Sequence, residues 1–269
     1  IISLLCPSKN ITFLAILPLA ISNPLIFASN QIYPELPAAL ASILIIKIFS
    51  KYKDSNPLNK KDTVICYLII AFLPWLQLKF TIISLILYSF LSWRLLFIQS
   101  NLTQYKKMTL LCIFSGCILI SYNHFAFNSF LGPYQQWSQL WGGRSPLEFS
   151  WKSITVLFGL IFDQEQGFLM QNPLNFIGLI GIGCFYKYNR SVSILTASVA
   201  TSILFINSMH TQWYGGYSMI GRFSWTSGLI FTIFTIYGLI TISSINRNFI
   251  LAINSFSILI SIYLFNLIS

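Results

Sequence analysis

Long runs of apolar residues dominate this sequence and leave few folds open to it. Only 8% of the 269 residues are charged, whereas 55% are hydrophobic. An ordinary soluble domain carries roughly 25% charged residues. A bilayer offers no water to backbone N–H and C=O groups, and an α-helix pairs these groups within the segment itself. Long apolar runs therefore indicate membrane-crossing α-helices. The sequence therefore predicts an all-α, polytopic transmembrane helix bundle and excludes a water-soluble globule.

Nine crossings are predicted from apolar runs bounded by charged or turn residues. We place them at residues 10–28, 36–50, 63–77, 80–98, 108–126, 172–186, 191–209, 223–243 and 248–268. Pro18 and Pro74 are expected to kink or break their helices. We interpret residues 1–269 as a single transmembrane domain. Because the chain opens at Ile1 without an initiator methionine or a complete first span, we expect it to be the C-terminal fragment of a longer chain.

The basic residues divide unequally between the two sides of the predicted bundle. Four lie on one side: Lys79, Arg144, Lys152 and Arg222. Twelve lie on the other: Lys9, Lys47, Lys51, Lys53, Lys60, Lys61, Arg94, Lys106, Lys107, Lys187, Arg190 and Arg247. The positive-inside rule places the Lys-rich loops in the cytoplasm, which predicts a multi-pass protein of the inner (plasma) membrane. The net charge of +10 is thereby explained without nucleic acid, since no basic helix or aromatic-interleaved basic loop is present.

One long loop, residues 127–171, is predicted on the outer side. Its apolar residues 154–162 are too few to cross a bilayer, so we expect one short interfacial or re-entrant helix there. Asp163 and Glu165 follow this segment. Two acids at this spacing converge on a divalent cation only in a turn, and the alternative is an ordinary solvated turn. No metal site is assigned, because two histidines are too few to build one from imidazoles.

Glu35 and Lys79 are outer-side charges beside predicted crossings. Glu35 stands in the string YPELPA at residues 33–38. It is either a helix N-terminal charge favoured by the dipole or a functional acid at membrane depth. Lys79 follows the string LPW at residues 73–75. It is either an interfacial anchor or a cation that faces a lipid phosphate.

The string WYGGYSMIGR, residues 213–222, enters the eighth predicted crossing from outside. Gly215 and Gly216 permit backbone geometry that exposes amide N–H groups to an anion, and Arg222 could hold a phosphate through two parallel hydrogen bonds. The alternative is a tight turn with an aromatic belt and a snorkelling arginine. Trp213 in this string and the preceding His210 are further candidates.

Four strings together resemble the later membrane segments of the bacterial GT-C superfamily of polytopic membrane glycosyltransferases. They are YPELPA at residues 33–38, LPW with KF at 73–80, FD with a following glycine at 162–167, and WYGG with GR at 213–222. The resemblance extends over most of the chain. It implies an enzyme that transfers a sugar from a polyprenyl-phosphate carrier to an envelope acceptor on the extracytoplasmic face. Such transfer needs a carboxylate base and cations that stabilise the departing phosphate, a role that Lys79 and Arg222 fit.

The sequence departs from the family at two places. The acidic motif that supplies the family's base belongs to the first outer loop, so we expect the catalytic base to lie upstream of Ile1. The family commonly has arginine where this chain has Lys79, which keeps the charge and loses bidentate geometry. The candidates for substrate binding are Glu35, Lys79, Asp163, Glu165, His210, Trp213, Gly215, Gly216 and Arg222. No cofactor is indicated apart from a divalent cation that the acids could bind.

Two other classes of function compete with this hypothesis. A membrane transporter or lipid-carrier flippase is expected to show inverted repeats and polar groups at mid-membrane depth, and the sequence shows neither. A non-catalytic membrane protein has no need of acids, arginine and glycines gathered on one side.

Overall fold

The computed structural model describes residues 19, 33–52, 56–133, 147–210, 221–243, 255 and 259. The helices in these ranges are α4 (Glu35–Ser50), α5 (Lys60–Leu76), η1 (Leu78–Phe80), α6 (Thr81–Trp93), η2 (Arg94–Ile98), α7 (Leu102–Phe127), α9 (Trp151–Phe162), α10 (Phe168–Gln171), α11 (Asn175–Tyr188), α12 (Arg190–Ser208) and α13 (Arg222–Ser243). Every regular element in the described ranges is a helix, and an isolated bridge joins Leu147 to His210. The predicted all-α fold is confirmed for this part of the chain.

Seven of the predicted crossings fall on described residues, and each is occupied by a helix. Four helical segments are long and apolar enough to cross a membrane by length and composition: Leu78–Ile98, Leu102–Phe127, Arg190–Ser208 and Arg222–Ile242. The other three, α4, α5 and α11, have 16, 17 and 14 residues. Of the predicted crossings at 10–28 and 248–268, the structure describes only residues 19, 255 and 259.

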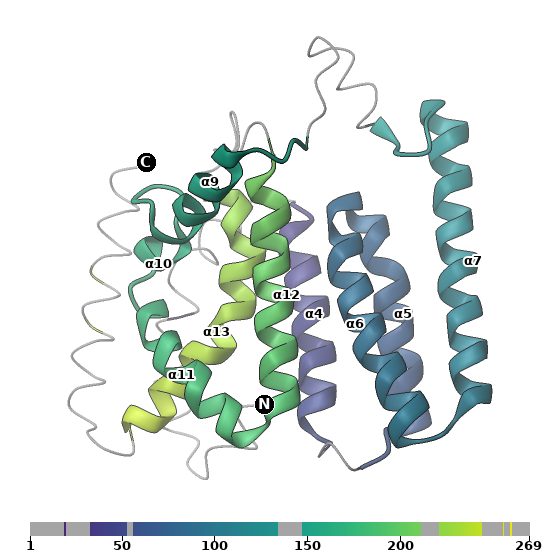
Figure 1. Ribbon diagram of the computed structural model, residues 1–269, viewed down its shortest axis with the longest axis horizontal. Coiled ribbons are helices and arrows are strands. Elements are labelled where there is room, and N and C mark those ends of the chain that lie inside the picture. Colours follow the sequence, from purple (N-terminus) through teal and green to yellow (C-terminus); the bar gives the residue numbers. More distant parts are fainter. Residues whose placement is uncertain are drawn as a thin grey trace.

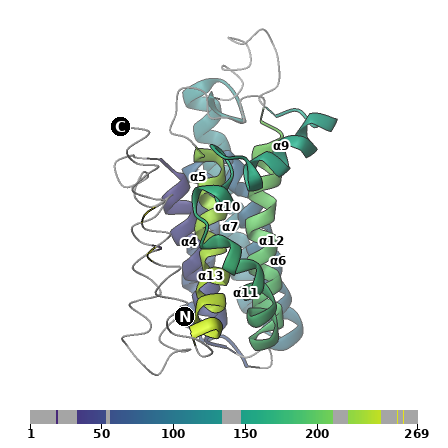
Figure 2. The same cartoon turned by 90° about the vertical axis from the view of Figure 1, so that its left-hand side faces the viewer.

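The long helices run side by side, with α7 at one edge and α11 near the other (Figure 1). At one end, here called the lysine-rich end, α4, α6 with η2, and α11 finish while α5, α7 and α12 begin. The opposite end carries α9 and α10, and Figure 2 shows α9 projecting from it. We call this the α9 end. Since α4 and α13 start there and α12 finishes there, the residues at these helix termini are brought together.

Asparagine side chains start two of the helices at the lysine-rich end. The Oδ1 atom of Asn101 accepts a hydrogen bond from the Gln104 N–H at 3.0 Å, which caps α7. The Oδ1 atom of Asn189 accepts one from the Val192 N–H at 3.1 Å, which caps α12. Such caps satisfy N–H groups that have no partner within the first helical turn.

Pro74 lies inside α5, and the helix continues through it to Leu76. Proline removes the N–H that would bond the carbonyl four residues earlier, which is that of Ile70. The Ser84 hydroxyl of α6 donates to this carbonyl oxygen at 2.7 Å. A side chain from the neighbouring helix thus bonds the carbonyl that the proline leaves without an N–H partner. The helix is not broken at Pro74, whereas Pro18 lies outside the described residues.

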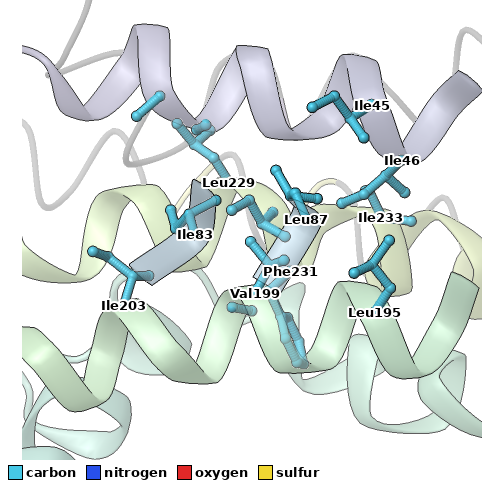
Figure 3. Packing of buried hydrophobic residues seen from close by; sticks show 14 of the residues in the cluster. Ile45, Ile46, Ile83, Leu87, Leu195, Val199, Ile203, Leu229, Phe231 and Ile233 are labelled. Carbon is cyan, nitrogen blue, oxygen red and sulfur yellow. The ribbon is translucent and has the colours of Figure 1, made fainter. Parts of the chain in front are cut away.

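The core lies where α4, α6, α12 and α13 meet (Figure 3). Its central contacts come from branched aliphatic side chains, among them Ile45, Ile83, Leu87, Val199 and Ile233. Of the four candidate spans, the one formed by α13 is the most enclosed and that formed by α7 the least. The packed core therefore fixes the termini of α4 and α13 relative to each other at the α9 end.

Candidate functional site

Glu35 opens α4 at the α9 end, and its side chain is only 1% exposed. Its Oε1 atom accepts a hydrogen bond from Lys79 Nζ at 2.9 Å and another from Arg222 Nε at 3.1 Å. Its main-chain oxygen accepts one from the Thr226 hydroxyl at 3.3 Å. One residue therefore joins α4, η1 and α13. We call Glu35, Lys79 and Arg222 the Glu35 cluster.

Lys79 reaches this carboxylate from η1, the single turn between α5 and α6. Gln77 has an extended backbone that ends α5, and the chain turns there before α6 begins. The Lys79 ammonium lies 5.3 Å from the centre of the Phe80 ring and 5.0 Å from that of Phe223. Aromatic faces attract cations, so these rings stabilise an ammonium whose side chain is 8% exposed.

Arg222 is the first residue of α13 and the most exposed member of the cluster, at 21% of its side chain. Its guanidinium carbon lies 4.0 Å from the centre of the Tyr33 ring. Only Nε bonds Glu35, and the guanidinium makes no further hydrogen bond within the described ranges. The two Nη groups of Arg222 therefore keep donors for a ligand.

The Glu35 cluster carries an unbalanced charge. Two cations and one carboxylate give a formal charge of +1, held by side chains that are largely removed from water. Burying a charge without a partner is costly. An anion at Arg222 would lower this cost, so the cluster has the charge expected of an anion-binding site.

His210 lies two residues beyond the end of α12, beside the cluster. Its ring centre is 5.0 Å from that of Phe223, the residue that also contacts Lys79. Burial, followed by the positive charges of Lys79 and Arg222, lowers the pKa of His210 to about 4. His210 is therefore neutral at pH 7 and leaves the charge of the cluster at +1.

Gly221 connects the start of α13 to the turn between α9 and α10. Its N–H donates to the Gln166 side-chain oxygen at 2.9 Å, and its φ of +73° suits glycine. A Cβ atom at Gly221 would lie 2.0 Å from the side-chain nitrogen of Gln171, whose amide donates to the Glu165 carbonyl. The hydrogen bond to Gln166 holds the residue before Arg222 in place. Sequence reasoning did not identify either glutamine, because a buried amide has no distinctive pattern.

Asp163 and Glu165 lie in this same turn. The Asp163 carboxylate accepts hydrogen bonds from the N–H groups of Glu165 at 2.9 Å and Gln166 at 2.8 Å, so it organises the turn itself. The Glu165 side chain is exposed. Within the described residues, neither acid forms an ion pair with the Glu35 cluster.

The structure thus brings together four of the candidates, Glu35, Lys79, Arg222 and the adjacent His210. Trp213, Gly215 and Gly216 lie outside the described residues. In the described part of the chain, no group of three His, Cys, Asp or Glu side chains is placed to hold a metal ion.

The fold and this cluster define a helical membrane protein with a buried, cation-rich ion cluster at one end of its bundle. Comparisons with protein-family models, with curated proteins and with solved structures found no match to the chain.

Proposed function

We propose that this chain belongs to a membrane glycosyltransferase that moves a sugar from a polyprenyl-phosphate carrier to an envelope acceptor, and that Lys79 and Arg222 bind the carrier phosphate. The observation that supports this most is the Glu35 cluster, in which both cations share one carboxylate oxygen at 2.9 and 3.1 Å. The general base that such a transfer needs is not assigned to any of these residues.

The chemistry of the cluster favours a phosphate as its ligand. The Nη groups of Arg222, which bond no other described residue, can donate two parallel hydrogen bonds to phosphate oxygens. Lys79 adds a positive charge that would stabilise the phosphate as it departs from the sugar. Because both cations are mostly removed from water, their attraction for this charge is stronger than it would be on an exposed surface.

The proposed topology has nine crossings in the plasma membrane, with the lysine-rich end in the cytoplasm. Three described cations lie at the α9 end: Lys79, Lys152 and Arg222. The other described cations lie at the lysine-rich end, among them Lys51, Lys60, Lys106 and Lys187. This asymmetry supports the orientation by the positive-inside rule. It places the Glu35 cluster near the outer leaflet, where the phosphate of an outward-facing carrier lipid would lie.

We further propose that α9 lies in the outer membrane interface and does not re-enter the bilayer. Its 12 residues give a length of about 18 Å, well short of a bilayer core of about 30 Å. One face packs on the core, through Val156, Leu157, Leu160 and Ile161. The opposite face exposes Trp151, Ile154, Phe158 and Phe162. Two apolar faces on one short helix fit a position between the bundle and lipid, with a tryptophan at headgroup depth.

Fluorescence quenching tests this position of α9. In bilayers whose lipids carry bromine near the headgroup, replacing Trp151 with phenylalanine is expected to remove a large part of the quenched emission, since 87% of Trp151 is exposed. The matched control is Trp225→Phe, because Trp225 is fully buried and should contribute little to quenching. Quenching that is unchanged in Trp151→Phe, or that is stronger with bromine near the bilayer centre, would contradict the interfacial position.

Binding of a carrier lipid tests the proposed function. With the protein in nanodiscs, Arg222→Gln is expected to weaken binding of decaprenyl-phosphoryl-mannose, -glucose or -arabinose by about 10- to 100-fold, the effect of losing hydrogen bonds to a charged group. Arg222→Lys keeps the charge but loses the planar, forked guanidinium. Its affinity for the lipid should lie between those of the wild type and Arg222→Gln. The control is Lys187→Gln, which removes an exposed charge at the lysine-rich end.

The outcomes separate the proposal from its competitors. Equal affinities for Arg222→Gln and Lys187→Gln, or no binding of any of the three lipids, would overturn it. Release of bound lipid to the opposite leaflet in proteoliposomes, with the sugar still attached, would favour a flippase instead.

A further inference from the structure

The second oxygen of the Glu35 carboxylate has no hydrogen-bond donor. Oε1 accepts from both cations, whereas Oε2 is buried and without a partner within the described residues. A buried acceptor left without a donor costs free energy, and folded proteins contain few of them. This oxygen therefore has the property expected of an atom that meets its donor on a ligand.

Glu35 also sets the charge of the cluster. With the carboxylate present the formal charge is +1, and without it the charge would be +2. A glycosylated carrier lipid is a phosphodiester with one negative charge. The bare carrier is a phosphate monoester with about −1.5 to −2 charges at neutral pH. A cluster of +1 matches the diester, whereas a pair of cations alone would match the monoester better.

We propose that Glu35 selects the glycosylated carrier over the bare one, by accepting a hydrogen bond from a sugar hydroxyl at Oε2 and by repelling the second charge of the monoester. This inference rests on the proposed function and goes beyond it. It requires a ligand in which an anionic phosphate and a hydroxyl donor lie close together. A sugar joined to a phosphate through its anomeric carbon has this arrangement.

The selection by Glu35 acts on the glycosylated donor before sugar transfer and on the bare carrier after it. The bond between the anomeric carbon and the phosphate oxygen breaks, the phosphate keeps the electron pair, and the acceptor oxygen bonds the anomeric carbon as its proton passes to a base and then to water. The carrier that remains has lost the sugar hydroxyl and gained a negative charge. Glu35 then favours its release, so the same carboxylate assists donor binding and product departure.

Wild-type protein supplies the first test, in nanodiscs at about pH 7.5. Decaprenyl-phosphoryl-mannose, -glucose and -arabinose are compared with decaprenyl phosphate, and at least one diester is expected to bind about tenfold more tightly than the monoester. Cations acting alone would give the reverse order, because the monoester carries more charge. Wild-type affinity for the monoester that equals or exceeds that for all three diesters would overturn the inference.

The variant Glu35→Gln supplies the second test. It is expected to abolish or reverse the preference, since the cluster becomes +2 and Oε2 is lost as an anionic acceptor. The matched control, Glu148→Gln, removes an exposed acid at the α9 end and should keep the wild-type ratio. Size-exclusion profiles establish that the variants are folded. If Glu35→Gln does not fold, Glu35→Asp takes its place, because it keeps the charge but draws the carboxylate oxygens back from the ligand. It should lower the ratio of diester to monoester affinity only in part.

Failure of the inference differs from failure of the proposed function. Binding of both lipid types with a ratio that Glu35→Gln and Glu35→Asp leave unchanged would overturn the role of Glu35 and preserve the phosphate site. Absence of binding for every lipid would overturn the phosphate site itself, and the role of Glu35 with it.

Discussion

Replacing Glu35 with glutamine is expected to destabilise the folded bundle by about 3–5 kcal/mol, the range found when one partner of a buried ion pair is removed. The carboxylate is 1% exposed and is the acid that joins Lys79 and Arg222. Without it, two cations remain near each other with little access to water. Their repulsion and their lost hydrogen bonds both act against folding.

A double variant separates these two effects, with stability measured by denaturant titration in detergent micelles. Lys79→Met alone should cost less than Glu35→Gln, because Glu35 keeps Arg222 as its partner. Adding Lys79→Met to Glu35→Gln should restore part of the lost stability, since a single cation remains and its ring contacts persist. Glu148→Gln, an exposed acid, should change stability by less than about 0.5 kcal/mol. Additive costs for the two cluster substitutions would show that the charges are not coupled.

The positions of the helices were predictable because long hydrophobic runs bounded by charged residues indicate helical segments. The predicted 36–50 and 191–209 match α4 and α12 to within a residue or so at each boundary. The predicted crossing 108–126 begins six residues after Leu102, the first residue of α7, because its boundary is set at the charges of Lys106 and Lys107. Helix length was harder to predict than helix position, since a lysine near a helix end can extend its ammonium towards water.

The ion cluster was predictable only as separate residues. Glu35, Lys79 and Arg222 each stood out as charges beside apolar runs, but Glu35 and Arg222 are 187 residues apart and no periodicity links them. One signal could have paired them. An acid and a cation at the same membrane depth in a chain with few charges are expected to find each other, since neither is stable alone in a medium of low dielectric constant.

Arg94 shows where charge counting misleads. The sequence places it inside the predicted crossing 80–98 and counts it among the cations of the cytoplasmic side. In the structure Arg94 is the first residue of the π-helical segment η2, and it is fully buried. One of its terminal nitrogens donates to the Asn56 carbonyl at 3.0 Å, and its guanidinium lies 6.0 Å from the Phe49 ring centre. Hydrophobicity patterns cannot distinguish a solvated arginine from one that packs between helices. Arg94 nevertheless lies at the lysine-rich end, the side of the bundle to which the sequence analysis assigns it.

The largest effect expected far from the Glu35 cluster concerns the contact between α11 and α13. Gly181 of α11 lies so close to α13 that a Cβ atom on it would be 1.8 Å from the Phe234 carbonyl oxygen. This obstacle is backbone, which cannot rotate away as a side chain can. Gly181→Ala is therefore expected to push the helices apart and to destabilise the bundle by about 1–3 kcal/mol or more, measured by the same denaturant titration.

Gly183 provides the matched control for this prediction, two residues further along the same helix. A Cβ atom there would meet nothing within 4 Å. Since alanine favours a helix over glycine by about 1 kcal/mol, Gly183→Ala is expected to be neutral or stabilising. Opposite signs for the two substitutions would show that close helix approach determines the cost at Gly181, because helix propensity is common to both. Equal stabilisation by both would mean that α11 and α13 do not approach each other so closely.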